Sequence, residues 1–559
     1  MNDMSKKRGL PVYTIGLDFG TLSGRAVLVD VRDGAEVAES VFDYPHGVMD
    51  SELPSGLRLP PDWALQHPGD YLDVFAHTVP AVLRASGVDP ADVKGLAIDF
   101  TASSPMPTTR DGTPLCYLPG LEDEPQAYIK LWKHHAAQRQ ADQINETARQ
   151  LGESWLPRYG GKISSEWFFS KLLQILQERP DIYAKMDRFI EAADWVIWQL
   201  TGVETRNTCT AGYKAMVQDG EFPSSAYFKA LDPAFENVVD EKVGRDFAEL
   251  GSKAGELRPE MAEMMGLPAG IAVAVANVDA HVTAPAVKAT EPGIMVMVMG
   301  TSTCHILSGT ELGEVDGMCG VVMGGIIPGL YGYEAGQSAV GDIFAWYVDH
   351  GVPPEYHLAA EQAGLNLHEY LEREAAKQAV GEHGLLALDW WNGNRSTLVD
   401  VDLTGMMLGM NLATRAPDIY RALIEATAFG TREIIEAFEA RGVEVRELVA
   451  AGGLPEKNAL LRQIYADVTG RTFRLSGSAQ APALGSAMHA AVAAGIYPNI
   501  QAAAEKMGKL KDEVVEPIAE NQLTYDRLYR EYRTLYEYFG RGANDAMKRL
   551  KAIRHEALG

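Results

Sequence analysis

A loop near the N-terminus combines residue types that bind phosphate and metal ions. Its small and polar residues include Asp18, Gly20, Thr21, Ser23 and Arg25. Glycines permit a tight turn whose backbone N–H groups can hold a terminal phosphate, the two hydroxyls add donors, and the carboxylate can hold Mg²⁺. The GxxxxGK[ST] pattern of a P-loop is absent. The alternative is a β-hairpin in which the aspartate satisfies turn amides.

A similar loop returns in the middle of the chain. Gly300, Thr301 and Ser302 follow the apolar run 294–299, much as the first loop follows the apolar run 12–18. We interpret this as an internal duplication, in which each of two lobes begins with a phosphate-sized hairpin. Facing each other, the two loops could hold the β- and γ-phosphates from both sides. A simple polar turn is the alternative.

A glycine pair lies further along, between a strand-like and a helical segment. Gly452 and Gly453 follow the run 448–451 and precede the segment 458–469. Glycines at such a junction permit close approach of a flat ring or a phosphate, and a helix N-terminus favours anions. The alternative is a strand-to-helix turn with Asn458 as the N-cap of the helix.

Asp279 is the candidate for proton transfer. It lies in the segment 277–281, after the strand-like run 271–275 and before the second hairpin. If two lobes face each other, its carboxylate lies in the cleft and could accept the proton of a hydroxyl that attacks phosphorus. A capping aspartate at a helix start is the alternative. His281 lacks the i, i+4 spacing of a helical metal site, so we expect it to be structural.

Polar side chains that could bind a sugar are scattered along the chain. They are Ser103, at the end of the strand-like run 93–99, and Trp132, Lys214 and Glu334. Taken singly, each has a solvated or capping role as its simpler interpretation. Adjacent histidines at 134 and 135 do not share a helix face, so we do not expect zinc there.

The elements needed to position these residues can be traced along the sequence. Runs of apolar residues predict the order β-β-β-α-β over 12–99, with a helix at 71–85. The second half alternates helices and strands, and we place the lobe boundary near residue 276. The tyrosine spacing predicts a packed helical stripe, formed by Tyr525, Tyr529, Tyr532 and Tyr536.

Composition narrows the class of protein. Of 559 residues, 46% are hydrophobic and 23% are charged, and the net charge is −26. Such acidity argues against general binding to nucleic acid or an anionic membrane. Only four cysteines occur, with no CxxC pair, and no apolar run is long enough to span a bilayer or to act as a signal peptide. We therefore expect a cytoplasmic protein.

Together these residues resemble a known superfamily. The loops at 16–25 and 300–303 and the segment 452–458 resemble the two phosphate motifs and the adenosine motif of the sugar-kinase, Hsp70 and actin superfamily. The segments 405–409 and 418–425 are similar to a signature of the FGGY carbohydrate kinases. The resemblance covers about residues 12–540. It implies an α/β fold of two RNase H-like lobes of the β-β-β-α-β-α-β-α type, 1–276 mainly for sugar and 277–559 mainly for ATP.

The resemblance also implies roles for individual residues. Asp279 would be the general base, and Asp18 would help to hold Mg²⁺. The two loops, with Gly20, Arg25 and Ser302, would contact phosphates, and Gly452, Gly453 and Asn458 would border adenosine. Sugar contacts carried over by position would be Ala102, Ser103, Trp132, Lys214, Asp279 and Glu334. Many relatives carry Trp-x-Asp-x-Arg for the sugar, whereas residues 132–136 here read Trp-Lys-His-His-Ala, which favours ribulose over xylulose or glycerol.

The expected activity is ATP-dependent phosphorylation of L-ribulose at O5, an early step in the use of L-arabinose. One alternative is another ketopentose or polyol as acceptor, such as D-ribulose, ribitol or L-xylulose. A second is a non-catalytic ATP switch of the actin or Hsp70 kind, which would turn over ATP regardless of sugar. The sequence leaves a homodimer open.

Overall fold

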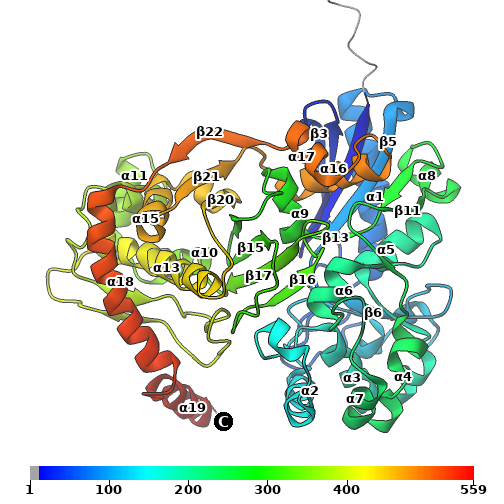
Figure 1. Ribbon diagram of the computed structural model, residues 1–559, viewed down its shortest axis with the longest axis horizontal. Coiled ribbons are helices and arrows are strands. Elements are labelled where there is room, and N and C mark those ends of the chain that lie inside the picture. The colour runs from blue at the N-terminus through cyan, green and yellow to red at the C-terminus, as the bar shows by residue number, and fades with distance from the viewer. Residues whose placement is uncertain (1–11, 559) are drawn as a thin grey trace, which may run out of the picture.

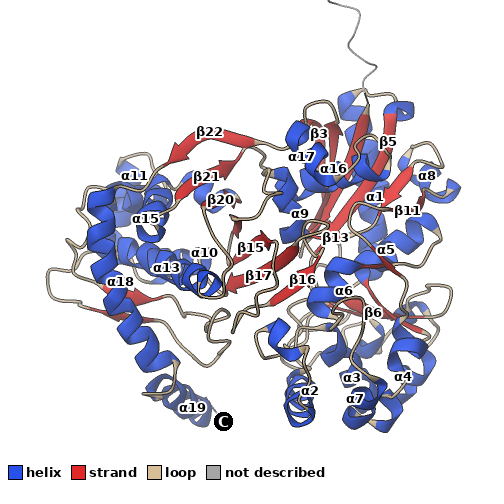
Figure 2. Ribbon diagram, viewed as in Figure 1, coloured by secondary structure: helices blue, strands red, loops and turns tan. Residues whose placement is uncertain are grey.

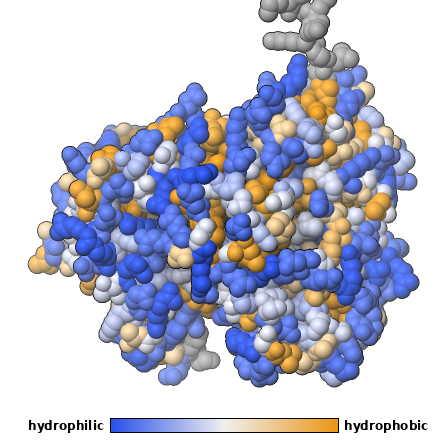
Figure 3. Space-filling view, viewed as in Figure 1, coloured by the Kyte–Doolittle hydropathy of each residue, from blue (hydrophilic) through white to orange (hydrophobic). Residues whose placement is uncertain are grey.

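The computed structural model describes residues 12–558 and contains two lobes, each built on a seven-stranded sheet (Figures 1 and 2). The visible face is mostly hydrophilic, with a notch between the lower parts of the lobes (Figure 3). Within the described residues, no helix combines the length and the apolar character needed to cross a membrane.

The first sheet has the predicted β-β-β-α-β beginning. Strands β1 (Tyr13–Phe19), β2 (Ser23–Asp30) and β3 (Ala35–Asp43) form antiparallel neighbours, and β5 (Val93–Phe100) pairs with β1 in parallel after helix α1 (Pro68–Ser86). The sheet order is β11-β12-β5-β1-β2-β3, and β13 also pairs with β5. The added strands are β11 (Lys253–Glu256), β12 (Ala272–Ala274) and β13 (Asn277–Val278).

The second sheet repeats this topology. Its order is β16-β17-β15-β14-β20-β21-β22, in which β14 pairs with β15 antiparallel and with β20 in parallel, as β1 does with β2 and β5. The repeated pairing pattern agrees with the predicted duplication. The strands are β14 (Ile294–Met299), β15 (Thr303–Gly309), β16 (Gly320–Met323), β17 (Tyr331–Gln337), β20 (Glu447–Ala451), β21 (Thr472–Ser476) and β22 (Leu510–Val515).

A helix from the C-terminal half packs on the first sheet. Helix α16 (Ala481–Ala493) lies against β1 and β5 (Figure 1), with α17 (Ile500–Met507) beside it. The approach is close because Gly16 has no side chain: a Cβ there would lie 1.8 Å from the carbonyl oxygen of Ala483. A common core joins residues of both sheets around α16. The division into 1–276 and 277–559 remains a prediction, since α16 contacts the first lobe.

A mainly helical insert follows β5 and forms the lower right part of Figure 1. It has its own aromatic-rich core and supplies several of the candidate sugar residues. Short strands β6 (Pro105–Thr108) and β8 (Arg188–Glu191) pair within it. Its helices are α2 (Gln138–Leu151), α3 (Phe168–Glu178), α4 (Pro180–Lys185), α6 (Thr208–Lys214) and α7 (Ser225–Leu231), whereas α5 (Ala192–Thr201) packs on the first sheet.

The remaining helices cover the second sheet or join the lobes, apart from α8 (Pro259–Met265), which packs with α1 on the first lobe. The tyrosine stripe lies on α18 and all four side chains are buried, which confirms its packing role. The helices are α8 (Pro259–Met265), α9 (Asp279–Ala286), α10 (Gly341–His350), α11 (Pro354–Gln362), α12 (Leu367–Ala375), α13 (Ala416–Glu439), α14 (Gly453–Lys457), α15 (Ala459–Thr469), α18 (Ala519–Gly540) and α19 (Ala546–Leu558).

Candidate active site

Three carboxylates meet where strands of the first sheet end. Asp18 near the end of β1 is the register partner of Asp99 on β5, and Asn277 of β13 pairs with Asp99 from the other side. Asp279 follows β13 as the first residue of α9, which lies between the two sheets in Figure 1. Because parallel strands bring their carboxyl ends to one edge of a sheet, residues far apart in sequence form one acidic cluster.

The pKa values of all three aspartates in the acidic cluster are raised. Burial, with a smaller effect from the Asp18 charge, raises the pKa of Asp279 to about 7. Burial also raises the pKa of Asp18, against the opposing charge of Arg25, and it raises the pKa of Asp99 well above its ordinary value. A carboxylate with a pKa near 7 suits a general base at neutral pH.

One oxygen of the acidic cluster lacks a partner. Oδ2 of Asp99 accepts a hydrogen bond from the Ser486 hydroxyl at 2.6 Å, while its buried Oδ1 has no hydrogen-bond partner among the described residues. Arg25 Nε lies 3.3 Å from Asp18 Oδ2. The buried carboxylates of Asp18 and Asp99, with one unpartnered oxygen, fit a hard divalent cation, because such cations prefer oxygen ligands.

The first hairpin turn is held by side chains from elsewhere. The N–H of Gly20 donates to the Ser23 carbonyl at 3.0 Å and closes the turn. The Trp132 indole N–H donates to the Thr21 hydroxyl at 3.1 Å, which leaves that hydroxyl free to donate its own proton. On the next strand Arg25 also donates to the Gln480 side chain, at 3.2 Å.

The second hairpin turn is braced by backbone. The Gly300 N–H donates to the Ser302 carbonyl at 2.9 Å, and the Thr301 carbonyl accepts from the Val340 N–H at 2.8 Å. Gly341 begins α10 directly beside the turn, and a Cβ there would lie 2.5 Å from the Gly300 carbonyl oxygen. The start of α10 therefore fixes this turn.

The glycine pair borders a cavity of about 140 Å³ at the ends of β20 and β21. Gly452 has a φ of 107° and comes so close to β14 that a Cβ would lie 2.3 Å from the Met299 carbonyl oxygen. Asn458 is not among the residues that line the cavity, because its side-chain oxygen accepts from the Leu461 N–H at 2.8 Å and caps α15. The lining residues are Ala450, Ala451, Gly452, Gly453, Glu456, Leu475, Ser476, Ser478 and Ala479.

Lys214 and Glu334 join the two lobes. Lys214 ends α6 in the helical insert, and its ammonium lies 3.0 Å from both carboxylate oxygens of Glu334 on β17. Burial alone would raise the pKa of Glu334, but Lys214 and the neighbouring His281 hold it well below its ordinary value. His281 Nε2 lies 3.2 Å from a carboxylate oxygen of Glu334, and the structural role of this histidine stays a prediction.

The other candidate sugar residues divide into two groups. Ala102 and Trp132 are partly exposed, and Trp132 contacts the first hairpin. Ser103 is buried, and its hydroxyl donates to Glu191 at 3.0 Å. The structure thus turns the Ser103 side chain into the protein, although the sequence suggested a polar contact to substrate.

Asp99 is the residue that sequence reasoning left out of the catalytic group. A signal was present, because the run 93–99 ends in an acid as the run 12–18 does. Only the parallel pairing of β1 and β5 shows that the two acids are neighbours.

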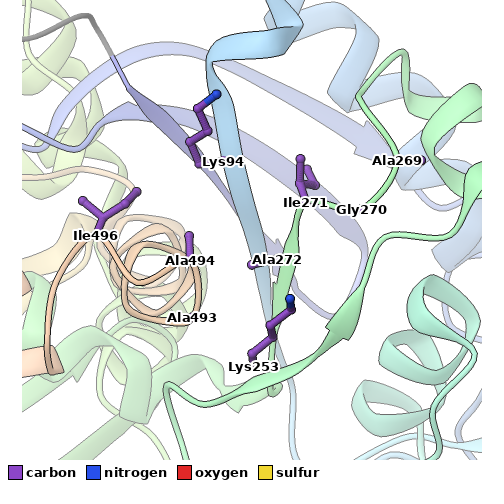
Figure 4. Close-up of a pocket in the computed structure, with 9 residues that line it drawn as sticks. All are labelled: Lys94, Lys253, Ala269, Gly270, Ile271, Ala272, Ala493, Ala494 and Ile496. Carbon is purple, nitrogen blue, oxygen red and sulfur yellow. The ribbon is translucent and has the colours of Figure 1, made fainter.

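Two other features, a hollow and a cluster of potential metal ligands, lie outside this site, and we do not interpret either as the active site. A hollow of about 410 Å³ lies at the opposite ends of β5 and β12 (Figure 4), where Lys94 donates to the Ala91 carbonyl and Lys253 pairs with Glu256. Its remaining lining consists of small and aliphatic residues, namely Ala269, Gly270, Ile271, Ala272, Ala493, Ala494 and Ile496.

The second feature is a cluster of His46, His67 and Asp70, whose potential ligand atoms lie within 4.8 Å of one another. The two imidazole rings stack with centroids 4.2 Å apart and planes inclined by 26°. Lone pairs of stacked rings run nearly parallel and do not converge on one ion. The hydrogen bond from His46 to Asp70 explains the cluster as a structural contact.

Family comparisons cover nearly the whole chain. A model of the N-terminal domain of the FGGY family of carbohydrate kinases matches residues 13–285, and one of the C-terminal domain matches residues 295–494. A ribulokinase from Geobacillus thermodenitrificans is 58% identical over 98% of this chain and 98% of its own length. A ribulokinase from Mycolicibacterium smegmatis is 55% identical, again over 98% of each chain.

Solved structures agree with the fold. A xylulose kinase from Rhodospirillum rubrum superposes with a TM-score of 0.76 at 21% identity, covering 94% of this chain and 98% of the other. A glycerol kinase from Plasmodium falciparum, solved with ADP, gives 0.73 at 15% identity with the same coverage. These matches, with the repeated sheet topology, confirm the predicted two-lobed α/β fold.

Proposed function

Because the chain belongs to the FGGY family of carbohydrate kinases, we propose that it phosphorylates L-ribulose at O5 with ATP, giving ADP and L-ribulose 5-phosphate. Relatives that are 55–59% identical along almost the full chain are named ribulokinases. The observation that carries the chemistry is the position of Asp279, a partly exposed carboxylate at the start of α9 between the lobes, where burial raises its pKa to about 7. With this activity the protein would act in the cytoplasm, in an early step of L-arabinose catabolism.

Proton transfer is the task of Asp279. Its carboxylate accepts the proton of the sugar 5-hydroxyl as O5 forms a bond to the γ-phosphorus and the bond from that phosphorus to the leaving ADP oxygen breaks. Asp279 Oδ1 also accepts the N–H of Ala280 at 2.6 Å, which fixes the orientation of the carboxyl group. The second oxygen is then the one available to the hydroxyl.

The nucleotide lies between the two hairpins in this proposal. Gly452 and Gly453 border the cavity that would take the adenosine, and the Thr21 and Thr301 turns would contact the phosphates. Mg²⁺ bound with ATP would be held by Asp18, with Asp99 beside it, and it would offset the negative charge of the phosphates. The unpartnered Asp99 oxygen supports this placement.

The sugar lies between Lys214, Glu334 and Trp132. The Lys214–Glu334 pair spans the lobes, so a sugar that hydrogen-bonds to both residues also holds the lobes together. Closure of this kind excludes water and favours transfer to the sugar over hydrolysis of ATP.

A panel of acceptors tests the proposal. ADP release is measured with L-ribulose, D-ribulose, L-xylulose, ribitol and no sugar, each with Mg²⁺. We expect the highest kcat/KM with L-ribulose and little turnover without sugar. A higher kcat/KM with another acceptor would reassign the substrate, and ATP turnover indifferent to all of them would indicate a nucleotide switch instead.

A further inference from the structure

One buried lysine joins two turns of the candidate sugar site, residues 101–104 and 130–132. Lys171 lies on α3 with no exposed surface. Its ammonium donates to the carbonyl oxygens of Ser103 at 2.8 Å, Leu131 at 2.9 Å and Lys130 at 3.3 Å. An ammonium has three protons, so all of them are used on backbone carbonyls of two turns distant in sequence.

A buried glutamate holds one of these turns from another side. Glu191 ends β8, and its two carboxylate oxygens accept the Ser103 hydroxyl at 3.0 Å and the Ser104 N–H at 2.8 Å. Burial lowers the pKa of Lys171 and raises that of Glu191, while the charge of each opposes the shift of the other. Ser103 is therefore held through its carbonyl by a cation and through its hydroxyl by an acid.

The two turns carry residues that the family resemblance assigns to sugar binding. Ala102 precedes Ser103, and Trp132 follows Leu131, whose carbonyl Lys171 holds. The Trp132 indole in turn donates to Thr21 in the first hairpin. A shift of either turn would move a sugar contact and, through the indole, the phosphate-side hairpin.

We propose that Lys171 and Glu191 are positioning residues that lock the 101–104 and 130–132 turns together and so set the affinity for the sugar without touching it. The inference rests on the proposed function, because it takes the two turns to be part of the sugar site. It predicts that loss of either charge weakens sugar binding far more than nucleotide binding.

The test compares Lys171→Met with Lys242→Met by steady-state kinetics. Lys242 belongs to the same insert and also donates to a backbone carbonyl, that of Met186 at 2.7 Å, but it lies outside the two turns. We expect Lys171→Met to raise the sugar KM at least tenfold and to change the ATP KM less than twofold. Lys242→Met should change both by less than twofold.

Two substitutions of Glu191 give a second test, in which the expected rise in the sugar KM differs between the variants. Glu191→Gln keeps an acceptor for the Ser103 hydroxyl, so it should raise the sugar KM less than Glu191→Ala. An equal rise in both KM values for the Lys171 variant, or an unchanged sugar KM, contradicts the inference. If Lys171→Met does not yield folded protein, the Glu191 series decides alone, and an unchanged sugar KM in both Glu191 variants overturns the proposal.

The wild-type acceptor panel separates this inference from the proposed function. If another sugar is preferred, the ribulose assignment fails, and the variants are then compared on that sugar. If the preferred sugar is L-ribulose but its KM does not respond to Lys171 or Glu191, only the positioning role fails.

Discussion

The two hairpins share a topology but carry different chemistry. Asp18 lies two residues before Gly20 and pairs with Arg25 across the first hairpin, whereas Val298 lies two residues before Gly300 and pairs with Cys304 across the second. The acids of the candidate catalytic group all lie at the edge of the first sheet. The second lobe contributes the cavity beside Gly452 and the cross-lobe carboxylate of Glu334.

The two hairpin turns are also held by different kinds of contact. Side chains of Gln66, Trp132 and Arg25 hold or contact the first turn, at distances of 2.8 to 3.3 Å. Backbone at the start of α10 holds the second. A duplicated fold can thus keep its strand order while one turn is held by side chains from distant segments and the other by the backbone of the following helix.

The largest expected effect comes from Asp279, which lies beside the carboxyl edge of the first sheet at the start of α9. Asp279→Asn should lower kcat by about 10²–10⁴-fold, because the amide cannot accept the hydroxyl proton. Sugar binding, measured by calorimetry, should change little, since the two side chains have the same shape. A near-normal kcat would remove Asp279 from the base role.

The pH dependence should follow the same group. The base acts only when ionised, so kcat/KM should fall about tenfold per pH unit below an apparent pKa near 7 and level off above it. In the Asp279→Asn variant the residual activity should lose this limb. An acidic limb that persists in the variant would belong to another group.

The second lobe is best disturbed at Gly452. Gly452→Ala places a methyl group against the Met299 carbonyl at a φ of 107°, and the strain should cost about 1–3 kcal/mol. We expect the ATP KM to rise roughly tenfold, which corresponds to about 1.4 kcal/mol, with a smaller change in the sugar KM.

Gly442→Ala is the control for the Gly452 variant. Gly442 has a φ of 81°, but an added Cβ would meet no atom within 4 Å. It should lower the melting temperature slightly and leave the ATP KM unchanged. If the two variants raise the ATP KM equally, the cavity beside Gly452 is not the nucleotide site.

The smallest effect tests the link between the first hairpin and the sugar side. Trp132→Phe removes one hydrogen bond to Thr21, worth about 0.5–1.5 kcal/mol. The sugar KM should rise by roughly two- to tenfold. Thr301→Val in the second hairpin should instead alter the ATP KM and leave the sugar KM nearly unchanged. A change of the sugar KM in both variants would mean that the hairpins do not differ as described.

Sequence patterns predicted the β-β-β-α-β beginning, several later strands and helices and the repeated hairpin, because these depend on local spacing. The apolar run 294–299 and the Gly-Thr turn are visible without any tertiary information, and so is the tyrosine stripe of α18. The sequence also pointed to Asp18 and Asp279 through their places at the ends of apolar runs. The FGGY resemblance that it carries was confirmed by the family models.

Tertiary structure alone decided which polar groups became neighbours. Sequence spacing does not reveal that Lys171 reaches carbonyls 41 and 68 residues away, or that Ser103 turns inward to Glu191. Those contacts depend on how the insert folds back onto the end of β5. The spacing of apolar residues determines local helices and strands. Which buried charges become neighbours depends instead on the path of the whole chain.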